Sequence, residues 1–469
     1  MEEGGFSSVV RISNVSDFIA PSQACILPLR KNEKEDSATI SVGIRKRSNG
    51  INTSNNKKIT VSLNDCLACS GCITSAETVL VQEQSTAKLI DGLSRCKLGV
   101  VTISPQAICS IAVKRGFSVA ETSIKLAKAF KNLGATYILD SSFGRYLSLS
   151  LSFEEFKNQR MKGTIFCSAC PGFVCYAEKT YGNLLIPHLS RVRSPQAMMG
   201  SIVKDYLAKL TTTNVTDIFH ATVMPCFDKK LEASRPEFSG SGRQVDCVIS
   251  TAEADDILGN CSEEIFANQV APSSGGWLTA LERGIIIGQF ENISNDLFAN
   301  TSGGYADYII ARFLKEYQGP LEVRKSSKQA FFSICLFHLA KNLEIFEIAK
   351  GELVLLTVAK CYGFRNIQNI VQKIKRQKCP FDYIEIMACP SGCANGGGQI
   401  RAETTEEREN ILTRVEEKYR QLIPSAEMEC EIERVKNEWA SFNDSFEKLF
   451  YSSYQVVDKS IMESFNLRW

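Results

Sequence analysis

The sequence predicts an α/β fold with parallel-rich sheets flanked by helices. From about residue 100 onward, short apolar runs of strand length alternate with helical patterns, and this alternation is typical of parallel sheets covered on both faces. The 469 residues allow about three domains, or one large body with an appended module. We therefore expect most of the chain to form an α/β body.

The strand candidates are six apolar runs bounded by turn residues, at 136–139, 164–166, 218–224, 245–250, 353–359 and 383–387. The clearest helix candidate is 118–134, in which apolar residues recur near 3.6-residue spacing before Gly134, a residue suited to end a helix. A second, highly charged helix is predicted at 403–422, and the tail from about Asn443 is more polar.

Composition excludes several classes of protein. The 54 Lys and Arg residues nearly balance the 52 Asp and Glu residues, which argues against a dedicated nucleic-acid binder or a disordered chain. The N-terminus has no signal-peptide pattern, and no run of about 18 apolar residues could span a membrane. We expect a cytoplasmic protein whose partners are other proteins, with neither nucleic acid nor membrane among them.

The 18 cysteines stand against only three histidines, so any metal site would be dominated by thiolates. In a reducing compartment, closely spaced cysteines are more often metal ligands than disulfides. Isolated cysteines in apolar runs, among them Cys109, Cys247 and Cys335, are better interpreted as core residues.

The first metal motif is C-x2-C-x2-C, formed by Cys66, Cys69 and Cys72. Three thiolates at this spacing can hold one iron-sulfur cubane while backbone N–H groups face its sulfides. A zinc site is the weaker alternative, because zinc usually takes two separated pairs. The cubane needs a fourth ligand or an open iron, and the candidates left open by spacing are Cys25, Cys96 and Cys109.

Three further cysteine strings each follow a strand candidate. They are CSACPGFVCYAEKTYG from Cys167, MPCFDKKLEASR from Met224 and EIMACPSGCANGGGQ from Glu385. Their principal cysteines are therefore expected at the carboxyl ends of strands, the edge where α/β sheets form their sites; they are Cys170, Cys226, Cys389 and Cys393. The run of three glycines after Cys393 would let the backbone approach a bulky cofactor.

These strings resemble the three cluster-binding motifs of iron-only hydrogenases. Together with RSPQ at 193–196 and TSGG at 301–304, they make the whole chain similar to the nuclear prelamin A recognition factor-like proteins of cytosolic iron-sulfur assembly. The resemblance implies a two-lobed hydrogenase-like body with a small N-terminal ferredoxin-like module. It also implies two 4Fe-4S clusters.

Carried over position by position, the resemblance assigns eight ligands. The N-terminal cluster takes Cys25, Cys66, Cys69 and Cys72, and the buried one takes Cys170, Cys226, Cys389 and Cys393. In hydrogenases the equivalents of Lys229 and Met387 surround a two-iron subcluster that the equivalent of Cys393 bridges. No catalytic residue is expected here, because Ala169 stands where hydrogenases have a proton-relaying Cys, and an alanine carries no proton.

Composition, pattern and the resemblance together predict five regions of the chain. They are an N-terminal segment with one cluster ligand (1–28), a polar linker (29–60), the N-terminal cluster module (61–115), the two-lobed body (116–400) and C-terminal helices with a tail (401–469).

The leading hypothesis for function is a non-catalytic carrier that receives clusters from a cytosolic scaffold and passes them to a targeting complex and apoproteins. The last residue, Trp469, resembles the terminal aromatic residue that such a complex captures. Two alternatives are an active iron-only hydrogenase or related redox enzyme, and an interaction protein of the nuclear envelope with structural clusters. The second alternative would add the nucleus as a location.

Overall fold

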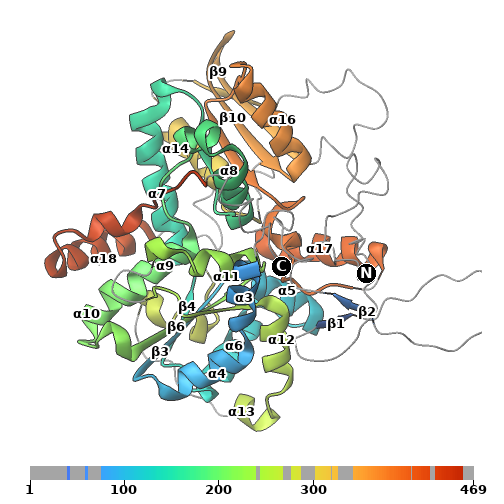
Figure 1. Ribbon diagram of the computed structural model, residues 1–469, viewed down its shortest axis with the longest axis vertical. Helices are drawn as coiled ribbons and strands as arrows, with labels where there is room; N and C mark the ends of the chain where they lie inside the picture. The colour runs from blue at the N-terminus through green and yellow to red at the C-terminus, as the bar shows by residue number, and fades with distance from the viewer. Residues whose placement is uncertain are drawn as a thin grey trace, which may run out of the picture.

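The computed structural model describes ten stretches of the chain: 40–42, 59–61, 75–238, 243–267, 276–286, 301–317, 320–325, 342–402, 404–422 and 428–457. Most of them form two lobes, each built on its own sheet, and Figure 1 shows one lobe above the other. A separate pair of short antiparallel strands, β1 (Ile40–Val42) and β2 (Ile59–Val61), lies within and just beyond the stretch predicted as a polar linker.

The lower lobe contains a four-stranded, fully parallel sheet with the order β4-β3-β6-β7. Its strands are β3 (Leu98–Ile103), β4 (Tyr137–Asp140), β6 (Ile218–Met224) and β7 (Cys247–Ser250). All six residues of β3 are buried, because helices cover both faces of a parallel sheet. The helices of this lobe are α4 (Thr86–Arg95), α5 (Pro105–Arg115), α6 (Val119–Asn132), α9 (Pro195–Ser201), α10 (Ala208–Leu210), α11 (Asp228–Ala233), α12 (Thr251–Gly259) and α13 (Glu263–Ala267).

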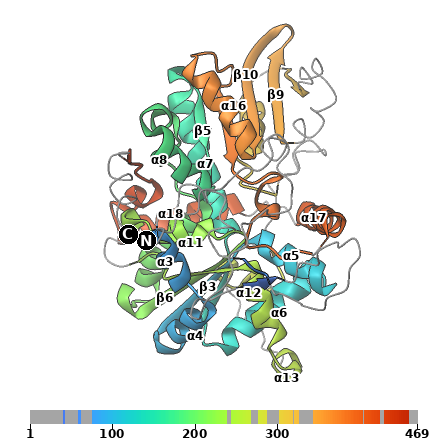
Figure 2. The same cartoon turned by 45° about the vertical axis from the view of Figure 1, so that its right-hand side comes forward.

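The upper lobe contains a five-stranded mixed sheet with the order β5-β11-β10-β9-β8. Its strands are β5 (Ile165–Cys167), β8 (Glu322–Lys325), β9 (Leu343–Lys350), β10 (Leu353–Tyr362) and β11 (Tyr383–Met387). The first three strands in the sheet order are parallel, and the last two are antiparallel to their neighbours. Helices α8 (Pro171–Leu185), α14 (Tyr305–Glu316) and α16 (Phe364–Lys375) pack around it, and α7 (Ser142–Gln159) contacts elements of both lobes (Figure 2).

The predicted α/β fold class is confirmed, and each of the six predicted strands is present. Two of them, β6 and β11, have the predicted bounds. The predicted helix 118–134 is α6, which Ser118 caps by accepting a hydrogen bond from the Glu121 N–H at 3.1 Å. Beyond its end Gly134 has a φ of +103°, a backbone conformation that favours glycine.

Three strands of the two large sheets were not predicted, namely β3, β8 and β9. The polar β8 (Glu322–Lys325) is an edge strand with no apolar run. The apolar β3 lies in the middle of the lower sheet, although residues 61–115 were assigned to an N-terminal module. The last part of that stretch therefore folds within the lower lobe.

The C-terminal region packs against two helices from earlier in the chain. Helix α17 (Thr405–Arg420), predicted at 403–422, lies on α5, and α18 (Met428–Phe442) lies on α7. The turn η12 (Phe446–Phe450) inserts two phenylalanines beside Trp439 in the core of the lower lobe. This part of the predicted polar tail is thus anchored by aromatic packing.

The remaining short helices include α3 (Ser75–Glu83), which packs on α11, and η11 (Gly392–Asn395), which follows β11. Further turns of 3-10 helix lie at Arg160–Lys162, Ile186–His188, Val215–Asp217, Pro236–Phe238, Gly276–Thr279 and Leu281–Arg283, and one π-helical turn lies at Ile202–Leu207. In the described part of the chain, no helix combines the length and the apolar character needed to cross a bilayer.

Candidate metal centre

Four cysteines follow the carboxyl ends of strands, as predicted. Cys170 lies three residues beyond β5 and caps the N-terminus of α8, and Cys226 lies two residues beyond β6. Cys389 lies two residues beyond β11, and Cys393 lies in η11. Because β5 and β11 are parallel neighbours, the turns that carry Cys170 and Cys389 meet at one edge of the upper sheet.

The fourth turn comes from the other lobe. Cys226 follows β6 of the lower sheet, whereas the other three cysteines follow strands of the upper sheet. The two glycines at 396 and 398 bring these turns together. A Cβ added to Gly396 would lie 2.2 Å from the Pro225 carbonyl oxygen, and one added to Gly398 would lie 3.3 Å from the Cys226 Cα. The glycine run is therefore needed for close contact between lobes.

Hydrogen bonds fix the cysteine turns. The Ala388 N–H donates to the Cys170 sulfur at 3.4 Å, so the first and third motifs are directly joined. The Gly398 N–H donates to the Pro225 carbonyl at 3.0 Å, joining the second and third motifs. The Cys393 N–H donates to the Ser302 hydroxyl at 3.0 Å. Ser302 belongs to TSGG, a motif for which the sequence suggested no role.

The four thiols act on one another electrostatically. Burial is the main cause that raises the pKa of each thiol, to about 12 for Cys170 and well above the ordinary value for Cys226 and Cys389. The next causes include repulsion from the neighbouring cysteines, since Cys170, Cys389 and Cys393 all raise the pKa of Cys226. Four thiolates so close together need a compensating cation, because desolvation and mutual repulsion both oppose their ionisation.

Each of the four residues retains some accessible surface, although protein surrounds each thiol closely enough for desolvation to dominate its pKa. Among the described residues, no group of three or more His, Cys, Asp or Glu side chains is compact enough for a single metal ion. Four cysteine thiols are the ligand set that 4Fe-4S clusters take, so the donor chemistry of these residues fits a cluster.

Lys229 is positioned by the RSPQ motif. Its ammonium group donates to Glu232 at 2.7 Å and to the Ser194 hydroxyl at 3.1 Å. The Gln196 amide donates to the Lys229 carbonyl at 3.0 Å and to Glu232 at 2.9 Å. The Lys229 charge acts on Cys393, where it lowers the pKa of the thiol against the larger effect of burial. The RSPQ motif supported the family resemblance, but nothing in the sequence indicated that it holds this lysine.

A buried carboxylate, that of Glu385, also acts on Cys393. Glu385 of β11 accepts hydrogen bonds from the Gly304 and Ala306 N–H groups at 3.2 and 2.9 Å, so it caps the start of α14. Burial raises its pKa, and its charge in turn raises the pKa of the Cys393 thiol. Met387, two residues along β11, is 1% exposed, and a Cβ on Gly303 would lie 3.4 Å from its methyl group.

The N-terminal motif lies outside the described residues, which exclude Cys25, Cys66, Cys69, Cys72 and Trp469. Helix α3 begins three residues after Cys72 and leads to a junction with the lower lobe. There the Gln84 amide donates to the Lys230 carbonyl at 2.8 Å, and its oxygen accepts from the Val248 N–H at 3.1 Å. The predicted module is therefore connected to α11, the helix after Cys226.

Within the described residues, no cysteine forms a disulfide bond. Cys109 and Cys247 are fully buried in the lower core, as predicted, and Cys335 lies outside the described residues. Cys96, a competitor for the fourth ligand of the first motif, makes a local hydrogen bond to the Leu93 carbonyl at 3.4 Å.

Residues 97–397 match the iron-only hydrogenase large subunit, C-terminal domain. The chain belongs to the iron-only hydrogenase-like family. A Brugia malayi relative named probable cytosolic Fe-S cluster assembly factor Bm6838 is 50% identical, with 100% of this chain and 99% of the relative covered. Mouse cytosolic iron-sulfur assembly component 3 is 37% identical, with 99% of both chains covered. The resemblance to assembly proteins of this family is thus confirmed.

The fold also resembles solved hydrogenases. A variant of apo [FeFe]-hydrogenase HydA1 from Chlamydomonas reinhardtii superposes with a TM-score of 0.61 at 20% identity, covering 79% of this chain and 98% of that one. The full-length relatives described above are named as cytosolic assembly factors and not as hydrogenases. Within its family, the chain therefore groups by sequence with the assembly factors and shares only the fold with the enzymes.

Proposed function

We propose that this protein is a non-catalytic component of cytosolic iron-sulfur protein assembly that binds two 4Fe-4S clusters. It receives clusters from a scaffold and mediates their delivery to a targeting complex and to apoproteins. The observation that carries the proposal is the convergence of Cys170, Cys226, Cys389 and Cys393 from both lobes. The cytosolic names of the relatives support the same compartment for this chain.

The interlobe cysteines would hold the first cluster, which when bound supplies a one-electron redox group and iron for transfer. The residues of this chain prepare the site in three ways. Thiols from both lobes ligate iron, the glycine run leaves room for backbone approach, and Lys229 balances negative charge beside Cys393. Metal binding would release the thiol protons and join the lobes.

The second cluster would take Cys25, Cys66, Cys69 and Cys72. This assignment rests on the C-x2-C-x2-C spacing and on the family resemblance. A site held by one loop and one distant cysteine depends on few elements of the fold. We expect it to exchange its cluster more readily than the interlobe site does.

The absence of catalysis rests on Ala169. This buried residue precedes Cys170, at the position where hydrogenases have the cysteine that relays protons. A methyl side chain can neither donate nor accept a proton. Infrared spectra of anaerobically purified protein test the hydrogenase alternative directly. Bands from iron-bound CO and cyanide would support it, and their absence at full iron content would reject it.

Cysteine variants test the two-site scheme. We expect Cys389→Ala to lose about four irons per chain and to lower the thermal midpoint, because metal-binding free energy is partly folding free energy. We expect Cys66→Ala to lose a similar amount of iron while the α/β body keeps its midpoint. Iron and sulfide assays with thermal melts give both quantities.

Cys109→Ala is the matched control for burial. Cys109 is fully buried but lies in the lower core, so its loss should reduce stability without reducing iron. Equal destabilisation by Cys66→Ala and Cys389→Ala would contradict the asymmetry between the sites. Full iron in Cys389→Ala would contradict the assignment of the interlobe ligands.

A further inference from the structure

After η12, residues 451–457 run along the outside of the molecule from the lower lobe to the upper lobe. Most of this segment is at the surface, with Tyr451 39% and Val456 50% exposed, and only Ser452 is buried. We call residues 451–457 the C-terminal cover. Its lower end is fixed, because Phe446 and Phe450 of η12 pack at 5.4 and 5.5 Å from the Trp439 ring.

The C-terminal cover pairs with the chain segment that itself crosses between the lobes. Residues 189–193 connect the upper lobe to α9, and Val192 and Tyr451 form an antiparallel bridge. Two main-chain hydrogen bonds hold the cover there, from the Arg193 N–H to the Phe450 carbonyl at 2.9 Å and from the Ser452 N–H to the Arg191 carbonyl at 2.7 Å. The side chains of Arg191 and Arg193 donate from Nε to the Ser452 and Tyr451 carbonyls at 3.2 and 3.1 Å. The Tyr454 hydroxyl donates to the Ser190 carbonyl at 2.9 Å.

The upper end of the cover is attached to α8, the helix that Cys170 caps. Glu178 of α8 accepts a hydrogen bond from the Gln455 N–H at 3.1 Å through its side chain, and one from the Val457 N–H at 3.2 Å through its carbonyl. Val456 lies against Gly182, where an added Cβ would come within 2.9 Å of a valine methyl group. The cover is therefore seated on the same helix that positions a proposed ligand.

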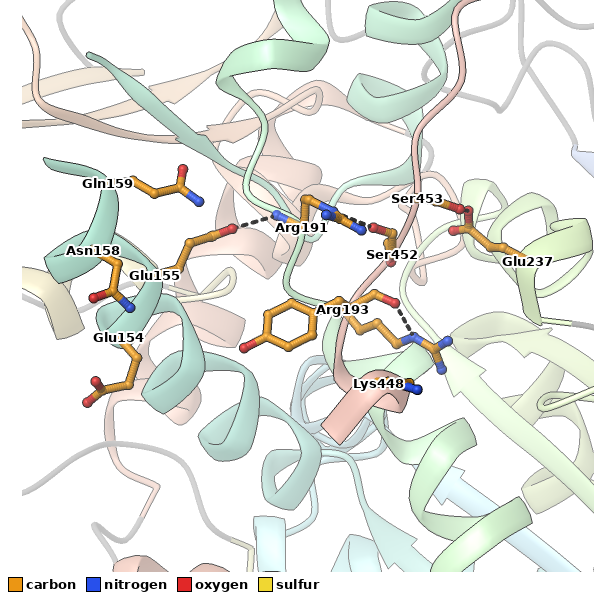
Figure 3. Close-up of a pocket in the computed structure, with 11 residues that line it drawn as sticks. Glu154, Glu155, Asn158, Gln159, Arg191, Arg193, Glu237, Lys448, Ser452 and Ser453 are labelled. Atoms are coloured by element: carbon orange, nitrogen blue, oxygen red, sulfur yellow. Dashed lines mark hydrogen bonds between the residues drawn. The ribbon is translucent and has the colours of Figure 1, made fainter. Parts of the chain in front are cut away.

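The cover separates two spaces. On its outer side lies a groove of about 510 Å³, lined by Ser452 and Ser453, Arg191 and Glu237 among others (Figure 3). On its inner side lies a small cavity of about 30 Å³, lined on one wall by Ser452 and Tyr454. Such a volume holds only about one or two water molecules. The C-terminal cover thus contributes lining residues to both spaces.

Other residues that line the small cavity are neighbours of the candidate metal centre. Pro171 is the residue after Cys170, and Ser194 and Glu232 are the two partners of the Lys229 ammonium group. Cys175 of α8 also lines this cavity. The small cavity therefore lies between the C-terminal cover and the residues that follow Cys170 or hold Lys229.

We propose that the C-terminal cover is a releasable lid over this small cavity, and that its release exposes the interlobe cluster to an acceptor. This inference rests on the proposed function for the presence of the interlobe cluster, whereas the contacts of the cover do not depend on it. The C-terminal cover is held by partly buried hydrogen bonds and by two packing contacts, Tyr454 against the core of the upper lobe and Val456 against Gly182. Its release would break these local contacts while both sheets keep their strands. The open groove beside it gives it room to move.

Two truncations and a pair of point variants test the lid. A chain ending at Val457 keeps the lid, and a chain ending at Phe450 lacks it. We expect the second to release iron to a ferrous chelator about tenfold faster than the first, under anaerobic conditions. Tyr454→Ala, which removes the aromatic contact and the hydrogen bond to Ser190, should also accelerate release. Gln455→Ala is the matched control, since only its main chain contacts Glu178.

Alkylation of Cys175 by iodoacetamide provides a readout that needs no cluster. Peptide mapping should show faster modification of Cys175 in Tyr454→Ala and in the chain ending at Phe450, and no change in Gln455→Ala. Equal alkylation and equal iron release in all four proteins would overturn the lid. If the shorter truncation fails to fold by circular dichroism, the two point variants decide.

The outcomes separate the lid from the proposed function. A wild-type protein without an interlobe cluster would reject the proposed function, yet Cys175 alkylation would still report on the lid. A loaded protein with unchanged rates in every variant would reject the lid alone.

Discussion

His220 illustrates how burial sets the charge of a single side chain. It lies in β6 with no exposed surface, between the Thr102 hydroxyl and the Gln244 carbonyl, each 2.9 Å from a ring nitrogen. Burial lowers the pKa of the imidazole from 6.5 to about 3. The carbonyl can only accept, so Nδ1 carries the proton and Nε2 accepts from Thr102.

This pKa predicts an acid-sensitive contribution to stability. Because the folded pKa is depressed, the unfolded chain binds the proton more readily, and the contribution is full above the unfolded pKa and is lost as pH falls below it. The loss approaches about 1.4 kcal/mol per pH unit below pH 6.5. His220→Gln cannot titrate, so its urea midpoint should fall less between about pH 7 and pH 5.5. An equal fall of the urea midpoint in the wild-type protein and in His220→Gln would contradict this account of His220.

Sequence identifies the four interlobe cysteines as candidates but not the side chains around them. The cysteines stand in short motifs, each after an apolar strand. Lys229 pairs with Glu232 of its own helix, but Ser194 and Gln196, which hold this pair, come from a distant segment and reach it only after folding. Glu385 looks like an ordinary strand residue in the sequence, and only its hydrogen bonds to the start of α14 explain its burial.

At the scale of elements, the glycine run after η11 fits the third motif against the second. Gly396→Ala would place a Cβ 2.2 Å from the Pro225 carbonyl, and both atoms belong to backbone that cannot move independently. We expect the loops carrying Cys226 and Cys393 to separate and the protein to lose about four irons per chain. Iron analysis of the purified variant measures this.

Gly351→Ala is the control for backbone strain. Gly351 lies in the turn between β9 and β10 with a φ of +59° and no atom within 4 Å of an added Cβ. It should cost about 1 kcal/mol of stability while full iron is retained. Normal iron in Gly396→Ala would show that the loops tolerate the added methyl group, and would contradict the role given to the glycine run.

Strand prediction was accurate where an apolar run was long and bounded, as in β6 and β11. It failed for β8, because an edge strand with one exposed face needs no apolar run. The C-terminal segment was expected to be a polar tail, yet η12 places Phe446 and Phe450 in the core. The two phenylalanines anchor this segment only because Trp439 lies beside them in the folded chain.

At the scale of the whole molecule, two sheets meet across the candidate metal centre. Neither lobe supplies four cysteines, because Cys226 comes from the lower sheet and the other three from the upper. A cluster bound there would join the lobes, and the C-terminal cover would close the joint from outside. The sequence predicts two lobes only through family resemblance, since no local pattern indicates which strand ends will face each other.

The central claim, that the chain carries two 4Fe-4S clusters, is tested most directly by Mössbauer spectroscopy with iron and sulfide quantitation on anaerobically purified protein. The account predicts about eight irons per chain, with both species having 4Fe-4S parameters. Zinc in place of iron, or a two-iron subsite beside the interlobe cubane, would contradict it.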